Sequence, residues 1–518
     1  MKKRWMLLLA SLITAIVLAG CSADSASEEE PEGTETETSD SKTLTIANGT
    51  DMVTFDIHDH NTTSTEAIHI NMFNYLIKRQ EDGSFEPDLA ESWENVDDTT
   101  WAFKLKEGVT FHNGEELTAD DVKFTLERVA NDNTLLEYGN YNQIAEVKVL
   151  DDLNFEIVTK SPEPALLNRL SRLGSSILPK DYIEENGWET FLESPIGTGP
   201  YKFVEWIKDD RVVLEANTDY FGQTPKWEKV VFRSIPEDST RVSELLTGGV
   251  DIAANVPPTD WGRINDNEGT SVAMSPTQRV MMLVARTGEG SVTADPKVRE
   301  AIDLAINKQE ILDSLMDGSG TVTRTRVTPG NTGANEELYG QQVFDPERAK
   351  ELLAEAGYAD GLELTLSSPQ GRYLKDSESA ELIAAYLEAV GITVNLEFLE
   401  WSSFTERYAS KSFNELFLIG YGNSMFDAAL ALERLQKEPA EGETDYDNPA
   451  VEELLQAAES NMNEEERVQQ YIEAQALIAE DRPQIYLYQL DAAYGVNDRV
   501  TYEPRLDEMI MVDDITLN

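Results

Sequence analysis

The alternation of helix and strand patterns over residues 295–419 constrains the fold more than any other feature of the sequence. At Asp295-Pro296 an N-cap residue stands directly before a proline suited to the first helical position, and apolar residues follow at helical spacing. Asp345-Pro346 repeats this pattern before a second helix. Helices that alternate with strands cover both faces of a mostly parallel sheet, so this half of the chain predicts an α/β fold.

Three strands are predicted in the same half. Apolar residues alternate over 362–366 and again over 392–398, and the helix between these strands begins near Ser377 and stops at Gly391. Residues 416–419 are apolar throughout, which is expected of a short strand covered on both faces.

The first half of the chain has a more β-rich pattern. Apolar residues alternate over 101–105, and Asn113-Gly114 is a strong turn signal. Thr118 and Asp121 have the spacing of a capping box, in its acidic variant, before a helix. These patterns predict a β-rich domain inserted beside an α/β lobe.

The N-terminus predicts export and lipidation. Three cations at 2–4 precede an apolar stretch over 5–19, which is shorter than the roughly 20 residues of a membrane span and is typical of a secretory signal. Cys21, the single cysteine, follows small residues as in the bacterial lipobox. We therefore expect a signal peptide over 1–20 and acylation of Cys21, which anchors an extracytoplasmic protein to the cell membrane. An ordinary signal peptide followed by a chance cysteine is the alternative.

The segment after the signal and the overall charge exclude several classes of protein. Residues 21–42 are rich in Ser, Thr, Glu and Asp, and after Cys21 they contain no apolar side chain larger than alanine, so we predict a disordered, lipid-anchored linker. Lys and Arg number 42 against 97 Asp and Glu, a formal charge of −55. Nucleic acid is therefore excluded as a partner, because phosphate binding needs clustered cations.

Several segments together resemble a known family. They are Ala90-Glu91-Ser92-Trp93, the run from Trp101 to Gly114, Leu117-Thr118-Ala119, Gly197-Thr198-Gly199-Pro200-Tyr201, Asn217 with Tyr220-Phe221-Gly222, Val250-Asp251-Ile252, and Asp295-Pro296 with Val298-Arg299. The pattern closely resembles the bacterial extracellular solute-binding proteins of family 5, which are the substrate-binding lipoproteins or periplasmic receptors of peptide, nickel and glutathione ABC importers.

The resemblance implies a type II periplasmic-binding fold, with two lobes of mixed sheets joined by a two-strand hinge and an extra domain inserted in lobe one. The two strand crossings are expected near Met282–Ala285 and Tyr486–Leu490. The implied bounds are 43–82 with 196–284 and 489–518 for lobe one, 83–195 for the inserted domain and 285–488 for lobe two.

The resemblance also implies a non-catalytic receptor. We expect a monomer that captures a peptide or peptide-like solute between its lobes and delivers it to the permease subunits of an ABC importer, without a cofactor. Two other functions stay open, an extracellular sensor of a peptide signal and a carboxylate-based hydrolase. The absence of a Gly-x-Ser-x-Gly elbow, a His-Glu-x-x-His helix and a P-loop from the sequence argues against an enzyme.

Ligand-binding residues are expected at the ends of strands that face the cleft. The loop after the first strand contributes Asn48, Thr50, Asp51 and Met52, and later loops contribute Arg372, Tyr373, Trp401, Tyr421, Asn423, Ser424 and Asp427. Aromatic rings would sandwich ligand side chains, and the Arg372 guanidinium would pair with a ligand carboxylate. The competing interpretations are an interlobe core for the aromatic rings and a surface ion pair for Arg372.

One loop departs from the pattern of peptide-binding relatives. These relatives place an aspartate three or four residues after the cleft aromatic, where it neutralises the ligand ammonium. Ser424 and Met425 stand at these positions here. Asp427 serves this purpose only if the loop is reshaped, so glutathione-like, modified or neutral solutes stay possible beside a standard dipeptide.

Metal binding is not predicted. His58 and His60 have the spacing that puts two imidazoles on one face of a strand, but no third ligand is apparent, and we interpret the pair as part of a solvated loop. His112 precedes the turn at Asn113-Gly114, and we expect it to pack or hydrogen-bond there.

Overall fold

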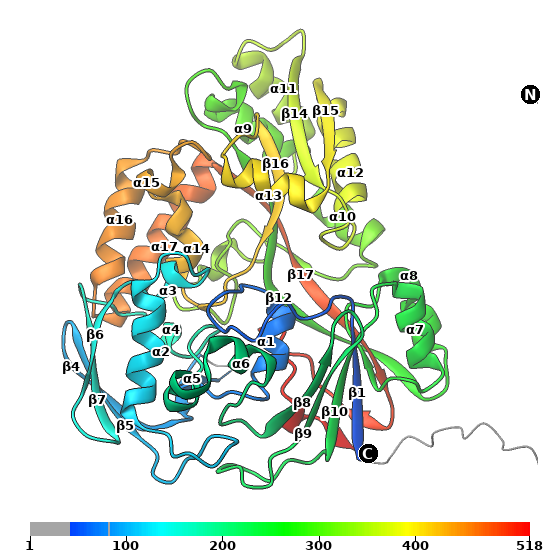
Figure 1. Ribbon diagram of the computed structural model, residues 1–518. Coiled ribbons are helices and arrows are strands. Elements are labelled where there is room, and N and C mark those ends of the chain that lie inside the picture. Colours follow the sequence, from blue (N-terminus) through cyan, green and yellow to red (C-terminus); the bar gives the residue numbers. More distant parts are fainter. Residues whose placement is uncertain (1–41, 81–82) are drawn as a thin grey trace, which may run out of the picture. The chain divides into compact units, whose positions relative to one another are not determined.

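The computed structural model describes residues 42–80 and 83–518 (Figure 1). The predicted signal peptide, the lipidation site at Cys21 and nearly all of the predicted linker lie outside these residues. Within the described ranges, no helix is both long and apolar enough to cross a membrane.

One long mixed sheet runs through the molecule in the order β15-β14-β16-β12-β17-β11-β1-β10-β9-β8, and β13 pairs with β17 beside it. Its strands are β1 (Thr43–Asn48), β8 (Tyr201–Ile207), β9 (Arg211–Ala216), β10 (Lys229–Ser234), β11 (Ile252–Ala253), β12 (Thr270–Ala285), β13 (Thr321–Val322), β14 (Leu362–Pro369), β15 (Ile392–Leu399), β16 (Leu416–Tyr421) and β17 (Gln484–Asn497).

The part built on β14, β15 and β16 is called lobe two. These three strands run parallel, as predicted, and helices pack beside them at the top of Figure 1. The predicted caps are present, since the side chains of Asp295 and Asp345 accept hydrogen bonds from the N–H groups of Lys297 and Arg348. The helices of this lobe are α9 (Pro296–Ala305), α10 (Lys308–Leu315), α11 (Pro346–Glu355), α12 (Asp376–Ala389), α13 (Trp401–Ala409), α14 (Ala428–Leu432), α15 (Lys437–Ala440), α16 (Pro449–Ser460) and α17 (Glu464–Asp481).

The part built on β1 and β8–β11 is called lobe one. β1 pairs in parallel with β10 and β11, whereas β9 is antiparallel to both β8 and β10. Its helices are α1 (Thr63–His69), α7 (Asp238–Leu246) and α8 (Pro258–Asn265). Lobe one and lobe two have separate clusters of buried apolar side chains.

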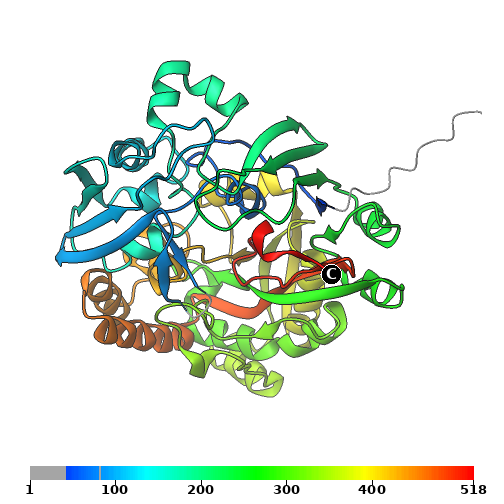
Figure 2. The same ribbon diagram turned by 90° about the horizontal axis from the view of Figure 1, so that it is seen from below.

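A second, antiparallel sheet forms the inserted domain, in the order β4-β5-β7-β6. Figure 2 shows its blue strands at one side of the molecule. The predicted capping box is present at the start of α2, where the N–H of Thr118 donates to the Asp121 carboxylate. The elements of this domain are β4 (Ala90–Asp97), β5 (Thr100–Leu105), α2 (Ala119–Asn131), α3 (Tyr138–Tyr141), β6 (Ile144–Val149), β7 (Asn154–Thr159), α4 (Leu166–Arg169), α5 (Lys180–Asn186) and α6 (Trp188–Glu193).

Two long strands connect the lobes. β12 and β17 pair along most of their length, and their register shifts between Pro276 and Val280 (Figure 1). The expected crossing at Met282–Ala285 is therefore placed too late, because these residues already pair with β16 inside lobe two. Pro276, which has no N–H to donate, is the last paired residue before this shift. The predicted domain bounds stay a prediction.

Candidate functional site

A cavity of about 1880 Å³ lies between the lobes. Residues of all three parts line it, for example Asn48 of lobe one, Arg172 of the inserted domain and Arg372 of lobe two. The strand crossing contributes Gln278 and Asp491. This cavity, formed by described residues of all three parts, lies where the sequence predicts ligand binding.

Lobe two presents a guanidinium and two aromatic rings to this cavity. Trp401 begins α13, stacks on Phe404 and leaves 36% of its surface exposed. The guanidinium carbon of Arg372 lies 5.0 Å from the Trp401 ring centroid and 5.1 Å from that of Tyr373. The Tyr373 hydroxyl donates to the carbonyl of Gly420, which fixes the ring. Burial, helped by the nearby charge of Arg279, lowers the pKa of Arg372 below its usual value.

Tyr421 ends β16 and also lines the cavity. Its hydroxyl donates to that of Tyr408 at 2.6 Å, and the Arg326 guanidinium carbon lies 4.4 Å from its ring centroid. Burial raises the pKa of the Tyr421 hydroxyl well above its usual value, so the phenol is neutral at pH 7. One face of the ring is therefore already occupied by a cation.

The loop after β1 forms the facing wall in lobe one. Asn48 ends the strand, and Thr50 shares a 3.2 Å hydrogen bond with Ser64 of α1. The Asp51 carboxylate accepts hydrogen bonds from the indole of Trp206 and the N–H of Asp209. These groups line the cavity, but the Thr50 and Asp51 side chains are bonded to their own lobe.

Met52 does not line the cavity and was wrongly assigned to the ligand site. Its side chain is 3% exposed and belongs to the apolar core of lobe one. Neighbouring residues of a loop can point in opposite directions. The apolar side chain of Met52 points into the core, because burial removes it from water.

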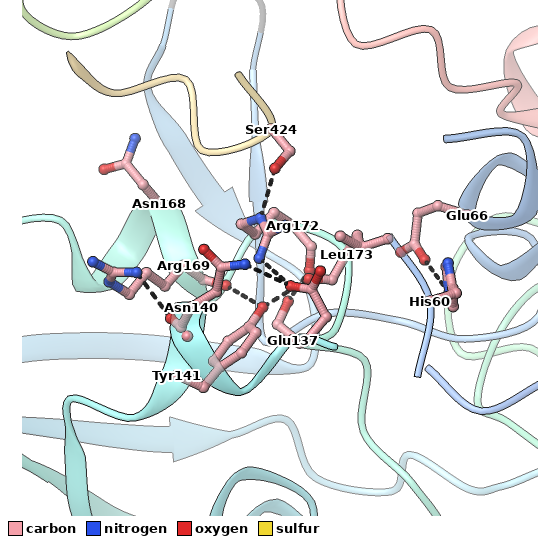
Figure 3. A network of polar contacts seen from close by, with 12 residues as sticks. His60, Glu66, Glu137, Asn140, Tyr141, Asn168, Arg169, Arg172, Leu173 and Ser424 are labelled. Atoms are coloured by element: carbon pink, nitrogen blue, oxygen red, sulfur yellow. Dashed lines mark hydrogen bonds and ion pairs between the residues drawn. The ribbon is translucent and has the colours of Figure 1, made fainter. Parts of the chain in front are cut away.

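The loop after β16 touches the inserted domain. The amide of Asn168 donates to the carbonyl of Met425 at 3.0 Å. Nε of Arg172 donates to the hydroxyl of Ser424 at 3.1 Å (Figure 3). Arg172 is in turn held by the buried carboxylate of Glu137 at 2.6 Å. The residues predicted as ligand contacts here thus link lobe two to the inserted domain.

Two neighbouring side chains of this loop are directed into the protein. The amide of Asn423 donates to Asn331, although Asn423 also lines the cavity. Asp427 is fully buried, pairs with both terminal nitrogens of Arg467 at 2.6 and 2.8 Å, and caps α14. Asp427 is therefore not placed to bind a ligand ammonium, because its carboxylate is already neutralised by Arg467.

Several residues that line the cavity were not predicted from the sequence. Arg279 comes from the strand crossing and donates to the carbonyl of Gly420. Glu508 belongs to a C-terminal segment that also reaches the cavity. Burial raises the pKa of the Glu508 carboxyl, while Arg279 and Arg372 oppose this effect. No local pattern marks these residues, because strands and loops distant in sequence bring them together.

The histidine pair at the start of lobe one is not in a solvated loop, contrary to the prediction. His58 and His60 are both buried, and burial lowers the pKa of His58 to about 3 and that of His60 to about 4. Arg128 donates to the His58 ring at 2.7 Å. The predicted packing role of His112 is met, since its ring bonds to the backbone of Gly197 and Gly199.

Known proteins share this architecture. The sequence model for bacterial extracellular solute-binding proteins, family 5 Middle, matches residues 84–442. The glutathione-binding protein GsiB of Salmonella paratyphi A is 29% identical, over 86% of this chain and 88% of that protein. The oligopeptide-binding protein AppA of Bacillus subtilis is 26% identical, over 94% of this chain and 93% of that protein.

Solved structures agree in fold. The periplasmic binding protein DppA from Helicobacter pylori, in complex with the peptide STSA, is 26% identical with a TM-score of 0.79, over 92% of this chain and 98% of that chain. NikZ from Campylobacter jejuni, in complex with Ni(L-His), is 26% identical with a TM-score of 0.75, over 89% of this chain and 95% of that chain. The predicted two-lobed α/β fold is confirmed.

Proposed function

The chain belongs to family 5 of the bacterial extracellular solute-binding proteins, and from that premise we propose that it captures a peptide or peptide-like solute for an ABC importer. The solute would bind between the lobes and be delivered to the permease subunits. The relatives matched are binding proteins, which supports a receptor without catalytic activity.

The size and position of the cavity carry this proposal. Its volume of about 1880 Å³ exceeds the roughly 300–1,000 Å³ usual for pockets that bind drug-sized molecules. Such a volume supports an extended ligand of several residues more than a single amino acid. A ligand that touches both lobes favours the closed form, because it makes more contacts there than in an open form.

The chemistry of the walls supports a ligand with a carboxylate. Arg279, Arg372 and Arg79 line the cavity and form no ion pair within 4.0 Å among the residues described, although the charges of Arg279 and Arg372 act on the Glu508 carboxyl. Arg372 lies beside Trp401, so a carboxylate bound there would sit next to a ring that packs on an apolar ligand side chain. Asp427 is excluded as the partner of a ligand ammonium by its pairing with Arg467.

Ligand identity is tested by native mass spectrometry of the purified protein, followed by denaturation to identify what is released. We expect a peptide or a glutathione-like compound at one copy per chain. Calorimetry with glutathione and with a tetrapeptide then compares the two classes directly. A protein that binds neither, and carries no bound solute after purification, contradicts the proposal.

Membrane anchoring is the second part of the proposal. We propose that signal cleavage precedes Cys21 and that its acylated thiol holds a monomeric receptor at the outer face of the cell membrane. Cys21→Ser should release the protein from the membrane fraction into the medium or periplasm. Retention of Cys21→Ser in the membrane fraction contradicts the lipid anchor and leaves the solute-binding proposal untouched.

A further inference from the structure

Two imidazoles and a carboxylate meet behind the lobe-one wall of the cavity. The Nε2 atom of His60 lies 3.6 Å from a carboxylate oxygen of Glu66, and Nδ1 of His69 lies 3.8 Å from the same oxygen. All three ligand atoms lie within 4.8 Å of one another. Glu66 and His69 are one helical turn apart on α1, and His60 approaches from the preceding loop.

These three atoms have no hydrogen-bond partner among the residues that the structure describes. Each side chain is at most 1% exposed. A buried polar atom without a partner costs on the order of 1–3 kcal/mol, and three such atoms that face one another point to a bound group between them.

The ring of His69 is oriented as a metal ligand. Its Nε2 lies 2.9 Å from the backbone carbonyl of Thr54, an acceptor, so Nε2 carries the proton and Nδ1 presents its lone pair to Glu66. Histidines that bind metals commonly donate their second N–H to a carbonyl or carboxylate in this way. Phe55 stacks on the ring at a centroid distance of 5.7 Å and limits its rotation.

His60 needs a change of tautomer before it can bind a metal. Its Nδ1 accepts a long, 3.3 Å hydrogen bond from the N–H of Thr62, so in this arrangement the ring proton is on Nε2. Metal binding at Nε2 removes that proton, and Nδ1 takes one up, which breaks the bond from Thr62. Thr62 is the N-cap residue of α1 and makes no side-chain cap hydrogen bond, so this change costs α1 no side-chain cap contact.

We propose that His60, Glu66 and His69 bind one divalent transition-metal ion, such as Zn²⁺, within lobe one. Four-coordinate zinc with bonds of about 2.0–2.1 Å separates its ligand atoms by about 3.3 Å, close to the 3.6 and 3.8 Å found here. Two neutral nitrogens and one oxygen suit zinc better than calcium or magnesium, which prefer oxygen ligands.

The surroundings of the cluster are compatible with a cation. The positive charge of Arg172 acts on both His60 and Glu66, but this guanidinium is paired with Glu137 at 2.6 Å, which offsets much of its charge (Figure 3). The Tyr75 hydroxyl donates to the other oxygen of Glu66 and so fixes the carboxylate. Glu66 is also among the residues that line the cavity, so the cluster lies directly behind the cavity wall. The proposal does not depend on the identity of the transported solute.

The test uses the full chain carrying Cys21→Ser, so that no thiol competes for metal. Titration with Co²⁺ reports coordination through its visible absorption, and calorimetry with Zn²⁺ gives affinity and stoichiometry. We expect one ion per chain, intense bands of tetrahedral Co²⁺, and a melting temperature that rises with Zn²⁺.

Two variants and a matched control decide the outcome. His69→Gln and Glu66→Gln should each weaken Zn²⁺ binding at least about 100-fold, because losing a ligand exceeds the 10–100-fold effect of losing its outer-shell partner. Glu66→Gln keeps the size and the contact with Tyr75, so it carries the test if His69→Gln does not fold. His112→Gln removes a histidine whose two nitrogens are already bonded, and affinity should not change. The proposal is overturned if tetrahedral Co²⁺ bands are absent or if all variants bind Zn²⁺ with equal affinity. The space between the three side chains would then hold a buried water.

Discussion

The two walls of the cavity differ in what their side chains already do. On the lobe-one wall, Thr50 bonds to Ser64, and Asp51 accepts hydrogen bonds from Trp206 and Asp209. On the lobe-two wall, Arg372 has no carboxylate within ion-pair distance among the described residues, and Trp401 keeps 36% of its surface exposed. The cavity-lining groups of lobe one are therefore already hydrogen-bonded, whereas lobe two offers a guanidinium without an ion pair and a partly exposed ring.

From this difference we expect lobe two to supply most of the free energy of ligand binding and lobe one to supply mainly the shape of the cavity. Guanidinium and aromatic groups are typical of residues whose removal costs the most affinity. Such side chains bind a ligand well only when the backbone that carries them is held in place. The buried ion pair of Asp427 and Arg467 helps to hold the loop after β16. Substitutions can test this support and each wall separately.

Removing the support has the largest expected effect. Arg467→Ala leaves the Asp427 carboxylate buried and unpaired, which should lower the free energy of unfolding by about 3–5 kcal/mol. Urea unfolding followed by circular dichroism measures the change. As a control, Arg348→Ala breaks an exposed pair with Glu355 and should change stability by less than about 1 kcal/mol. Equal effects of the two variants would mean that the buried pair does not support lobe two.

Removing a ring from the lobe-two wall should weaken ligand binding next. Trp401→Ala and Tyr421→Ala should each cost more than about 1 kcal/mol of affinity with the fold intact, as expected for buried aromatic anchors. Calorimetry with the ligand found by mass spectrometry measures the loss. Asp51→Asn is the matched change on the other wall, and we expect less than about 0.5 kcal/mol in affinity. Unchanged affinity in Trp401→Ala would exclude that residue from the site.

Glu508 allows the charge of the lobe-two wall to be changed by pH. Its carboxyl interacts with Arg279 and Arg372 and so competes with a ligand carboxylate for them. Glu508→Gln should strengthen binding of a carboxylate ligand by about 1 kcal/mol, the usual size of one surface charge interaction. A ligand without a carboxylate is the control and should bind with unchanged affinity.

The same residue gives a pH dependence of definite sign. Burial raises the pKa of Glu508 in the folded state, so over part of the acidic range the folded protein holds a proton that the unfolded chain has lost. This contribution to stability is present at low pH and is lost as pH rises through the folded-state pKa. Comparison of the native protein with Glu508→Gln by thermal unfolding from pH 4 to 8 should show a smaller loss with rising pH in the variant.

Local signals in the sequence were sufficient for most of the fold. The caps at Asp295 and Asp345 and the stop at Gly391 depend on neighbouring residues only, and each lies where predicted. The crossing of β12 between the lobes was misplaced because apolar residues continue along this strand. The change at the crossing is that β12 gains β16 as a second pairing partner, which the sequence does not show.

The site was harder to predict because its residues meet through tertiary contacts. Asp427 is 40 residues from Arg467, and no local pattern shows that the two are paired. The imidazoles of His60 and His69 come together only when α1 packs on the loop before it, so sequence spacing indicates only the pair of His58 and His60. Trp401 and Arg372, which line the cavity, were candidates because each lies in the loop or helix start that follows a predicted strand.

The smallest expected effect concerns the contact between lobe two and the inserted domain. Ser424→Ala removes the acceptor of the 3.1 Å hydrogen bond from Arg172, which keeps its ion pair with Glu137. The change should cost about 0.5–1 kcal/mol, and only in the form in which these parts touch. Ligand affinity should therefore fall slightly while the dissociation rate rises, because the form that holds the ligand loses one bond. Surface plasmon resonance separates the two rates, and Ser402→Ala, an exposed serine of α13, is the control. If Ser424→Ala changes only the association rate, the contact with Arg172 does not stabilise the bound form. The prediction for this contact is then wrong.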